Sequence, residues 1–443
     1  MDEEQALDLA ARILEEARAA GAEGAEAGVS LAHRMHVEAL SGAIARLENS
    51  HSCSLLLRVF KDGRKATLAS SDASAQGLRD AVRRAVTHTE LVAHDGFAGL
   101  PGTTATDVPS LDLDDPSLSA RVDDEKKHES LELERLIRRD DARIVNSAGS
   151  HYSDTSAVTA LANSNGFSSS YTWTRVMRSS APVALDGSVK RVGHYGTAGR
   201  HLADLESPEA VASHAVRRAV ELFGARKPST MRVPVIFERD VAASVLEDLF
   251  AAASAANVAL GNSWLAAQIG HRVGSDLVTI LDDGRLPGRL GSAPFDGEGV
   301  ATRRTSVFER GVLRTYLYDT YYARKLGAES AGNSTGTGIG PTNFYLEPGA
   351  ETLEQLIART QRGVLVLDTI GFATEHASGT YSRGARGFFI EGGEAAYPID
   401  EFTIAARYPE MLAGIDAVAD DLRFDGAVVS PSFRVAEMTV SGN

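Results

Sequence analysis

The spacing of apolar residues over the first 90 positions predicts a helix, several antiparallel strands and a second helix. Residues 4–20 carry apolar side chains at helical spacing, and Gly21 follows as a stop signal. Three segments show the apolar patterns of strands: 26–31, 36–40 and 54–60. Asp62 and Gly63 are typical of a hairpin turn, and helical spacing returns over 75–89. We therefore expect helices packed on one face of an antiparallel sheet.

The middle of the chain repeats this alternation after residues 93–117, which are rich in Gly, Pro, Asp and Thr and are typical of a surface excursion. A densely charged helix is expected over 123–140. Three more strands are predicted, at 143–147, 156–162 and 168–176. Asn165 and Gly166 form a hairpin signal before the last of them. A helix over 207–223 should begin with Ser207 as its N-cap and Pro208 at its first position.

Residues 224–229 are polar and contain Gly and Pro, as linkers between domains often do. A strand at 232–237 and a long Ala-rich helix at 240–257 follow, and the remainder is mostly strands and loops. A chain of 443 residues exceeds the usual size of a single hydrophobic core. The predicted fold class is α+β with two domains. Helices and an antiparallel sheet form the N-terminal domain (1–223), and the C-terminal domain (230–443) is rich in strands and contains the long helix.

Charge and cysteine content narrow the possible functions. The formal net charge of −15 opposes contact with a phosphate backbone, so direct nucleic-acid binding is not expected. Cys53 is the only cysteine, which rules out an intrachain disulfide and a thiolate metal cluster and suits a reducing compartment. The first residues are acidic and amphipathic rather than a basic start with an apolar core, and no apolar run approaches a membrane span. We expect a cytoplasmic protein without membrane contact.

The histidines show no metal-binding pattern along the sequence. His33 and His36 are three apart in a predicted strand, where this spacing places them on opposite faces. His128-Glu129 begins like a metallopeptidase motif, but no second histidine follows within a turn. The sequence therefore predicts no metal site in this chain.

The segment from His376 to Ala405 combines Gly, Ser, Thr, Tyr and Arg densely, and such loops are often built for binding. Ser382 does not form a nucleophile elbow, because Thr380 occupies the position where glycine is needed. One serine and His376 do not make a catalytic triad, so Ser382 is expected to hydrogen-bond within its own loop. We predict no catalytic residue here.

Two other segments contain residues that could carry chemistry: 333–341 and the turn between Glu391 and Glu394. The glycine-rich segment 333–341 ends in Pro341 and runs into a strand, whereas a phosphate-binding loop would open a helix. A glycine loop lining a cleft is the better interpretation. Glu391 and Glu394 flank a Gly-Gly turn and could perturb each other's pKa, but turn carboxylates are usually only solvated.

The C-terminal pattern resembles the TldD/PmbA family, whose members were once called modulators of DNA gyrase and are related to metallopeptidases. The resemblance covers nearly the whole chain and rests on the order and spacing of several segments. They are Gly311-Val312-Leu313, Tyr316-Leu317-Tyr318-Asp319, 342–349, 379–394, Glu401-Phe402-Thr403-Ile404-Ala405 and Pro431-Ser432-Phe433-Arg434-Val435.

The resemblance also indicates a branch within the family. The TldD branch holds zinc with a His-Glu-x-x-x-His helix after the first C-terminal strand and a cysteine near the C-terminus. Here Glu247, Asp248 and Ala252 stand where His, Glu and His would be, and 424–430 contains no cysteine. The chain therefore resembles the PmbA (TldE) branch, which lacks the metal.

This resemblance implies a non-catalytic subunit of a heterodimeric zinc metallopeptidase that removes leader peptides or degrades unfolded peptides. The zinc is then expected in a TldD-type partner, and this chain closes the chamber and holds an extended peptide, for example by strand addition. Candidate residues for contact with peptide or partner are Thr335, Gly336, Gly338, Asn343, His376, Gly379, Tyr381, Ser382, Arg383, Gly384 and Arg386. Two alternatives stay open: a stand-alone homodimeric peptide-binding protein and a modulator of DNA gyrase.

Overall fold

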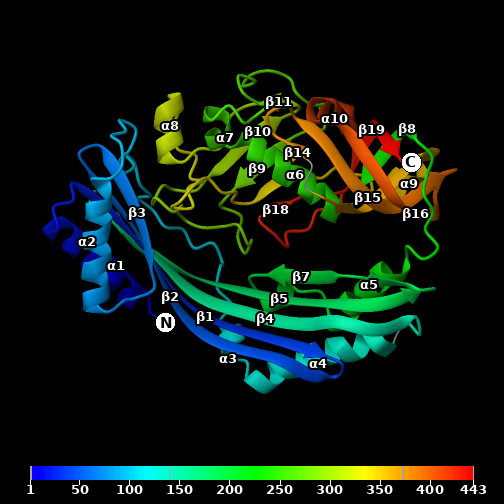
Figure 1. Cartoon of the computed structure of the whole chain (residues 1–443), viewed down its shortest axis with the longest axis horizontal. Helices are drawn as coiled ribbons and strands as arrows, with labels where there is room; N and C mark the ends of the chain where they lie inside the picture. The colour runs from blue at the N-terminus through cyan, green and yellow to red at the C-terminus, as the bar shows by residue number, and fades with distance from the viewer. Residues whose placement is uncertain (1, 140, 372–373, 443) are drawn as a thin grey trace.

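The computed structural model describes residues 2–139, 141–371 and 374–442. Its N-terminal half is built on one long, curved sheet with the strand order β3-β2-β1-β4-β5-β6, in which β7 also pairs with β5 (Figure 1). All of these pairings are antiparallel. The strands are β1 (Gly24–Leu40), β2 (Ala43–Lys61), β3 (Arg64–Ser70), β4 (Ile144–Asn163), β5 (Ser168–Asp186), β6 (Val189–Val192) and β7 (Tyr195–Gly199).

Helices cover one face of this sheet, as the apolar spacing predicted. They are α1 (Glu3–Ala19), α2 (Ala75–Thr89), α3 (Pro116–Ala120), α4 (Asp123–Arg139), a short 3-10 turn η1 (Leu202–Asp204) and α5 (Pro208–Val220). Alternate residues of β1, such as Val29 and Leu31, pack with α1 and α2 in one apolar core. Ser207 caps α5 by accepting a hydrogen bond from the Ala210 N–H, which confirms the predicted start of this helix.

Two predicted breaks within strands do not exist. The segments 26–31 and 36–40 are one strand, because β1 pairs without interruption with β4 through the polar residues His33 and Arg34. The segments 143–147 and 156–162 are likewise both part of β4. Backbone pairing on both sides carries a central strand through polar positions that the apolar pattern marks as a gap.

The C-terminal half contains two sheets. One has the order β11-β10-β9-β12-β18, and the other has the order β13-β8-β19-β16-β15-β14 with β17 beside β19. The strands are β8 (Met231–Phe237), β9 (Ile280–Asp283), β10 (Arg304–Glu309), β11 (Val312–Leu313), β12 (Phe344–Leu346), β13 (Arg362–Ile370), β14 (Thr374–Glu375), β15 (Thr380–Glu391), β16 (Glu394–Arg407), β17 (Ile415–Val418), β18 (Val428–Val429) and β19 (Phe433–Ser441).

Helix α6 (Arg239–Ala253) contributes Val245, Leu246 and Leu249 to the large apolar core that both sheets share. The predicted helix 240–257 is interrupted at Ser254, which is extended and forms a bridge with Leu317, and α7 (Ala255–Ala259) follows. The remaining helices are α8 (Thr320–Leu326), α9 (Leu353–Ala358) and α10 (Tyr408–Gly414).

Residues 379–387, part of the segment from His376 to Ala405 that was expected to be a loop, are mostly strand β15, which pairs with β13, β14 and β16. Glycines allow this close pairing: a Cβ on Gly387 would lie 1.8 Å from the Leu365 carbonyl oxygen. The Gly392-Gly393 turn is confirmed, with φ angles of 63° and 82° that favour glycine. The high glycine content of this segment therefore reflects strand packing and a hairpin rather than an open loop.

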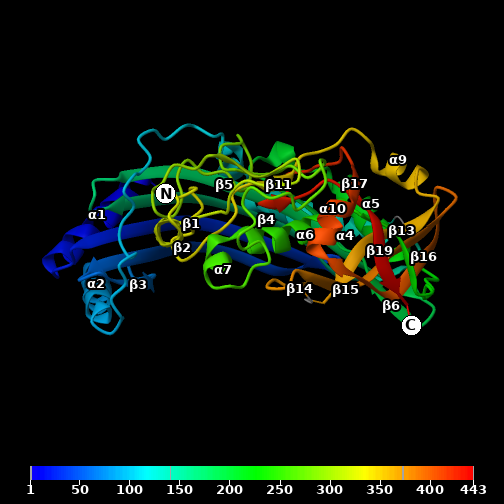
Figure 2. The same ribbon diagram turned by 90° about the horizontal axis from the view of Figure 1, so that it is seen from above.

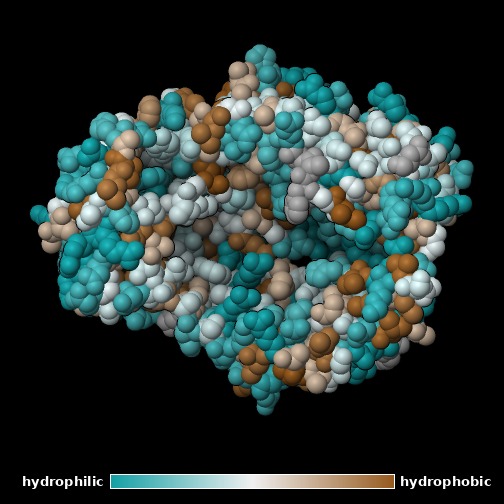
Figure 3. Space-filling model, in the orientation of Figure 1, coloured by the Kyte–Doolittle hydropathy of each residue, from teal (hydrophilic) through white to brown (hydrophobic). Residues whose placement is uncertain are grey.

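The two halves face each other across the free face of the long sheet (Figure 1), and seen from above the C-terminal half lies over much of this sheet (Figure 2). Residues 224–229 connect α5 to β8. The space-filling view shows the surface hollowed between the halves (Figure 3). Among the described residues, none of the helices combines the length and apolar character needed to cross a bilayer.

Candidate functional site

A cavity of about 360 Å³ lies between the free face of the long sheet and loops of the C-terminal half. Its sheet side is lined by Glu26, Gly28, Val29, Ser30, Ser54, Leu56, Thr159, Ala160, Leu161 and Tyr171. Its loop side is lined by Gly291, Ala293, Phe295, Asp296, Gly297, Thr302, Gly332, Asn333, Ser334, Thr335, Gly340, Pro341 and Thr342. The glycine-rich segment singled out in the sequence thus forms one wall of a cavity.

The loop at 333–341 is a tight hairpin. The Thr335 N–H donates to the Gly338 carbonyl at 2.8 Å, and Ser334 bridges Ile339. Gly336 has a φ of 84°, and a Cβ there would lie 2.7 Å from Cδ2 of Leu56 on β2. Glycine therefore lets the loop approach the sheet closely, whereas Gly338 faces open space.

A buried carboxylate holds this hairpin in place. Asp296 accepts hydrogen bonds from the N–H groups of Glu298 at 2.8 Å, Ser334 at 2.9 Å and Val300 at 3.0 Å. Burial, with a contribution from the nearby Glu298 charge, raises the pKa of Asp296 to about 7. The cavity wall therefore contains a carboxyl group that changes charge near neutral pH.

Arg58 joins the two halves beside the cavity. It donates through Nε to Glu26 at 2.9 Å, through Nη1 to Glu298 at 2.8 Å and through Nη2 to the Gly297 carbonyl at 2.9 Å. Burial alone would lower the pKa of Arg58, but the carboxylates of Glu26 and Glu298 raise it. Burial raises the pKa of Glu26 to about 7, and Arg58 opposes this shift. The buried guanidinium of Arg58 thus forms ion pairs with two buried carboxylates.

Asn343 follows the last lining residue, Thr342, and is a structural residue behind this wall. It is fully buried, and its Nδ2 donates to the Asp283 carbonyl at 2.6 Å and to Ser292 Oγ at 2.8 Å. Its Oδ1 accepts a hydrogen bond from the Gly291 N–H at 3.0 Å. These contacts occupy the amide within the chain, so the structure does not present it to a ligand.

A second group of predicted residues meets between α6 and β15. The Arg383 Nη2 lies 2.7 Å from Asp248 Oδ2, and the Tyr408 hydroxyl donates to the same oxygen at 2.6 Å. Arg383 also donates to Ser244 Oγ at 3.2 Å. Burial, together with Asp248, raises the pKa of Tyr408 well above its usual value, which keeps its hydroxyl protonated as a donor. Asp248 therefore forms its ion pair and hydrogen bond with Arg383 and Tyr408 of the same chain.

The other predicted residues of β15 differ in their exposure to solvent. Tyr381 is fully buried with its ring in edge-to-face contact with Tyr408, whereas Ser382 and Gly384 are partly exposed. Arg386 is partly exposed, with its Nε 3.2 Å from Asp400.

His376 and Gly379 lie in the turn before β15. The His376 carbonyl accepts from the Trp264 N–H at 2.9 Å, and a Cβ on Gly379 would come within 2.9 Å of the Trp264 ring. The structure therefore does not bring the 379–387 candidates into the cavity beside Thr335, because none of them is among the residues that line it.

Sequence reasoning missed Glu26, Arg58, Asp296 and Glu298. One signal was available: Arg58 is a charged residue inside the apolar run from Leu55 to Phe60. A cation in such a run needs a buried anion, but the sequence does not say which one.

Three models of one family match successive parts of the chain. Domain 1 of the PmbA/TldA metallopeptidases matches residues 25–88, the central domain matches 112–223 and the C-terminal domain matches 230–442. The metalloprotease PmbA of Escherichia coli O157:H7 is 31% identical over 440 residues, which cover 97% of this chain and 96% of that protein. The chain belongs to the PmbA/TldD family.

Solved structures show that the PmbA/TldD fold is kept at low sequence identity. A protein of Bacteroides thetaiotaomicron, described as a candidate modulator of DNA gyrase, superimposes with a TM-score of 0.93 at 24% identity over 100% of both chains. TldE of Thermococcus kodakarensis gives 0.87 at 22% identity over 98% of this chain and 100% of that one. At this identity the likeness concerns the fold alone.

Zinc is the metal that the PmbA/TldD resemblance implies, and the residues of α6 do not fit it. Glu247 is exposed, Asp248 is bound by Arg383 and Tyr408, and Ala252 is buried with an apolar side chain that cannot coordinate. Cys53 lies on β2 in the other half of the molecule. No zinc chemistry is therefore assigned to α6 in this chain.

Proposed function

We propose that this chain is the non-catalytic subunit of a two-chain zinc metallopeptidase of the TldD/TldE type. A TldD-type partner supplies the zinc ion and cuts the peptide, and this chain closes the chamber and holds the peptide in an extended form. Leader peptides and unfolded peptides are the proposed substrates.

One observation carries the division of roles. The metal-motif positions on α6 hold an exposed carboxylate, an ion-paired carboxylate and a buried methyl group. A zinc site with an open position needs three protein ligands, commonly histidines and a carboxylate. The similar protein of Escherichia coli O157:H7 is named a metalloprotease. Because α6 of this chain lacks a zinc ligand set, the proposal places the zinc ion in a partner chain.

The cavity supports the role of holding a peptide. Its walls combine strands β1, β2 and β4 with five glycines: Gly28, Gly291, Gly297, Gly332 and Gly340. Glycine leaves backbone groups accessible, and extended peptides are commonly bound through their backbone. The carboxyl groups of Glu26 and Asp296 add two acidic positions to the lining.

The test is co-expression with a TldD-type chain, followed by measurement of zinc content, subunit ratio and peptide cleavage. The proposal predicts an equimolar complex and cleavage that requires both chains. Zinc-dependent cleavage by this chain alone would contradict it. A stable homodimer that ignores the partner would favour a stand-alone peptide-binding protein, and salt-sensitive retention on DNA would favour gyrase modulation.

A variant of the cavity wall and a control variant refine this test. Gly297→Ala would bring a Cβ within 2.3 Å of the Gly336 backbone nitrogen, so it should displace the 333–341 hairpin and weaken peptide cleavage by the complex. Gly102→Ala is the control, because nothing lies within 4 Å of the added atom and Gly102 is not among the candidate contact residues. Equal cleavage by both complexes would argue against a peptide-holding role for this cavity.

A further inference from the structure

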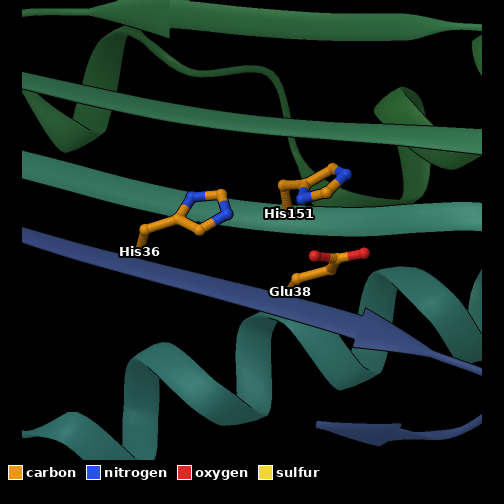
Figure 4. Close-up of side chains that lie close together, drawn as sticks. All are labelled: His36, Glu38 and His151. Carbon is orange, nitrogen blue, oxygen red and sulfur yellow. The ribbon is translucent and has the colours of Figure 1, made fainter. Parts of the chain in front are cut away.

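Three side chains with metal-binding groups meet on the long sheet, outside the cavity and far along the chain from α6. His36 and Glu38 come from β1, and His151 comes from β4. One ligand atom of each lies within 4.8 Å of the other two. Figure 4 shows the two rings and the carboxylate gathered across the neighbouring strands. Among the described residues, this is the group of histidine, cysteine and carboxylate side chains close enough to share one ion.

Strand register places all three on one face. Glu38 pairs directly with His151, and His36 is two residues before Glu38 on the same strand. The same alternation places Ser30 and its pairing partner Thr159 in the cavity wall. The three side chains therefore stand on the inner face, which is turned away from the helices that cover the sheet.

The backbone departs from regular pairing at this point. The β1–β2 register shifts between Glu38 and Ala39, and the β4–β5 register shifts between Ser147 and Ser150. Gly149 lies within the second irregularity with a φ of 120°. Bulges re-aim side chains and are frequent next to functional sites.

Gly149 also leaves space for the ligand atoms. A Cβ at this position would lie 2.9 Å from His151 Nε2 and 3.2 Å from Glu38 Oε1. Both rings retain a buried nitrogen, Nδ1 of His36 and Nδ1 of His151, without a hydrogen-bond partner in the protein. Buried polar atoms are nearly always satisfied, so each ring has a nitrogen whose partner the described chain does not supply.

We propose that His36, Glu38 and His151 bind one divalent transition-metal ion, with zinc as the best fit. Two imidazoles and one carboxylate form a ligand set that zinc uses with a fourth position left open. Calcium and magnesium prefer all-oxygen surroundings and fit this set less well. Ligand atoms bound at about 2.1 Å around a tetrahedral ion lie roughly 3.4 Å apart, so the three side chains must draw together slightly on binding.

The open position would face the inner surface and accept water or an oxygen atom of a bound peptide. This site is separate from the metal-motif positions on α6 and does not depend on the proposed partner. The proposed two-chain function could fail while this site stands, and the reverse also holds.

The experiment uses the isolated, tag-free chain after removal of metal with a chelator. Titration with Zn²⁺ is followed by calorimetry, and titration with Co²⁺ is followed by its visible absorption, which reports the coordination geometry. The expected result is one ion per chain and a tetrahedral cobalt spectrum. His151→Ala and His36→Ala should lose this binding, and Glu38→Gln should weaken it at least about tenfold, because loss of even an outer-shell partner of a metal ligand costs about 10–100-fold in affinity.

A second histidine pair provides the control. His33 and His51 lie on β1 and β2 with rings 4.4 Å apart, and His33 Nε2 lies 2.7 Å from Asn49 Oδ1 rather than beside a carboxylate. The His33→Ala, His51→Ala double variant should bind one ion as the intact chain does. Zinc should also raise the melting temperature of the intact chain but not that of His151→Ala, which separates loss of the site from loss of folding.

Two results would overturn the proposal. The first is failure of the intact chain to bind zinc at micromolar concentrations. The second is unchanged binding in His151→Ala, which would place the bound ion elsewhere in the chain.

Discussion

The buried ion-pair network at the junction gives the sharpest test of how the two halves are held together. We consider the replacement Arg58→Met, which keeps the apolar stem of the side chain and removes the guanidinium. The Arg58 and Glu26 side chains are 4% and 3% exposed, and that of Glu298 is 8% exposed. Both carboxylates would lose their cation and stay out of water.

The expected cost follows from this burial. Removing one partner of a buried ion pair typically destabilises a protein by about 3–5 kcal/mol, because the remaining charge is buried without compensation. Here two carboxylates lose their partner, so we expect a loss in the free energy of unfolding at the upper end of this range. Glu298 retains the hydrogen bond from the Thr320 N–H at 2.9 Å, which limits the loss on its side.

The matched control is Arg46→Met on the same strand. Arg46 pairs with Glu48, but their side chains are 59% and 44% exposed. Exposed pairs contribute little to stability, so this variant should unfold at the same urea concentration as the intact chain. Urea denaturation, followed by tryptophan fluorescence and circular dichroism, measures both effects.

A combined variant tests the reason for the loss. Glu26→Gln and Glu298→Gln, added to Arg58→Met, remove the uncompensated charges and should restore at least half of the lost stability. The reasoning would be refuted if Arg58→Met and Arg46→Met behaved alike, or if the added glutamines gave no recovery.

Three further predictions concern the core and the cavity. Asp248→Ala should destabilise the chain by about 3 kcal/mol, because Arg383 is only 11% exposed and loses its carboxylate, whereas the neighbouring Glu247→Ala should have little effect in the same urea assay. The pKa of Asp296 is raised to about 7 in the folded chain, so its ionisation lowers stability as pH rises from about 4 to about 7. Asp296→Asn should flatten this decline in urea unfolding measured from pH 5 to pH 8, and an unchanged slope would contradict the assignment, with the exposed Asp80→Asn as the control. Gly387→Ala places a Cβ 1.8 Å from the Leu365 carbonyl oxygen and should prevent correct pairing of β13 with β15, which would appear as a large fall in melting temperature, whereas Gly392→Ala has open space and should cost less through its positive φ alone.

Helices and turns with local signals were predictable from the sequence. Helix α2 (Ala75–Thr89) has the predicted bounds, and the Asp62-Gly63 turn joins β2 to β3 as expected. These features depend on residues close together in the chain, where periodicity and turn chemistry act directly. The length of the strands was not predictable. Strand β1 continues through His33 and Arg34 because it pairs with β4, which is distant in the sequence.

The candidate site was only partly accessible to sequence reasoning. The segment 333–341 has a glycine pattern that points to a close approach, and the structure places it in a cavity wall. The 379–387 segment has a similar composition, but its glycines serve strand pairing. Composition cannot distinguish a cavity wall from a paired strand, because glycine is favoured both where a neighbouring backbone approaches closely and where φ is positive.

Contacts between residues that are far apart in the sequence could not be predicted from the sequence. His33 and His36 are three residues apart in the sequence, and they lie on opposite faces of β1, as this spacing predicts. His151 pairs with Glu38 only through the register between β1 and β4. The same holds for Arg58 and Glu298, which are 240 residues apart.

The pairing of β1 with β4 also determines the order in which the long sheet can form during synthesis on the ribosome. β1 and β2 can form a hairpin soon after synthesis, but the second edge of β1 waits for β4, which begins at Ile144. At a synthesis rate of about 5–20 residues per second, the intervening stretch of roughly 100 residues leaves this edge open for about 5–20 s. An open edge pairs readily with other chains. Nascent chains that pause before β4 should therefore be the form of this protein that most needs protection by chaperones.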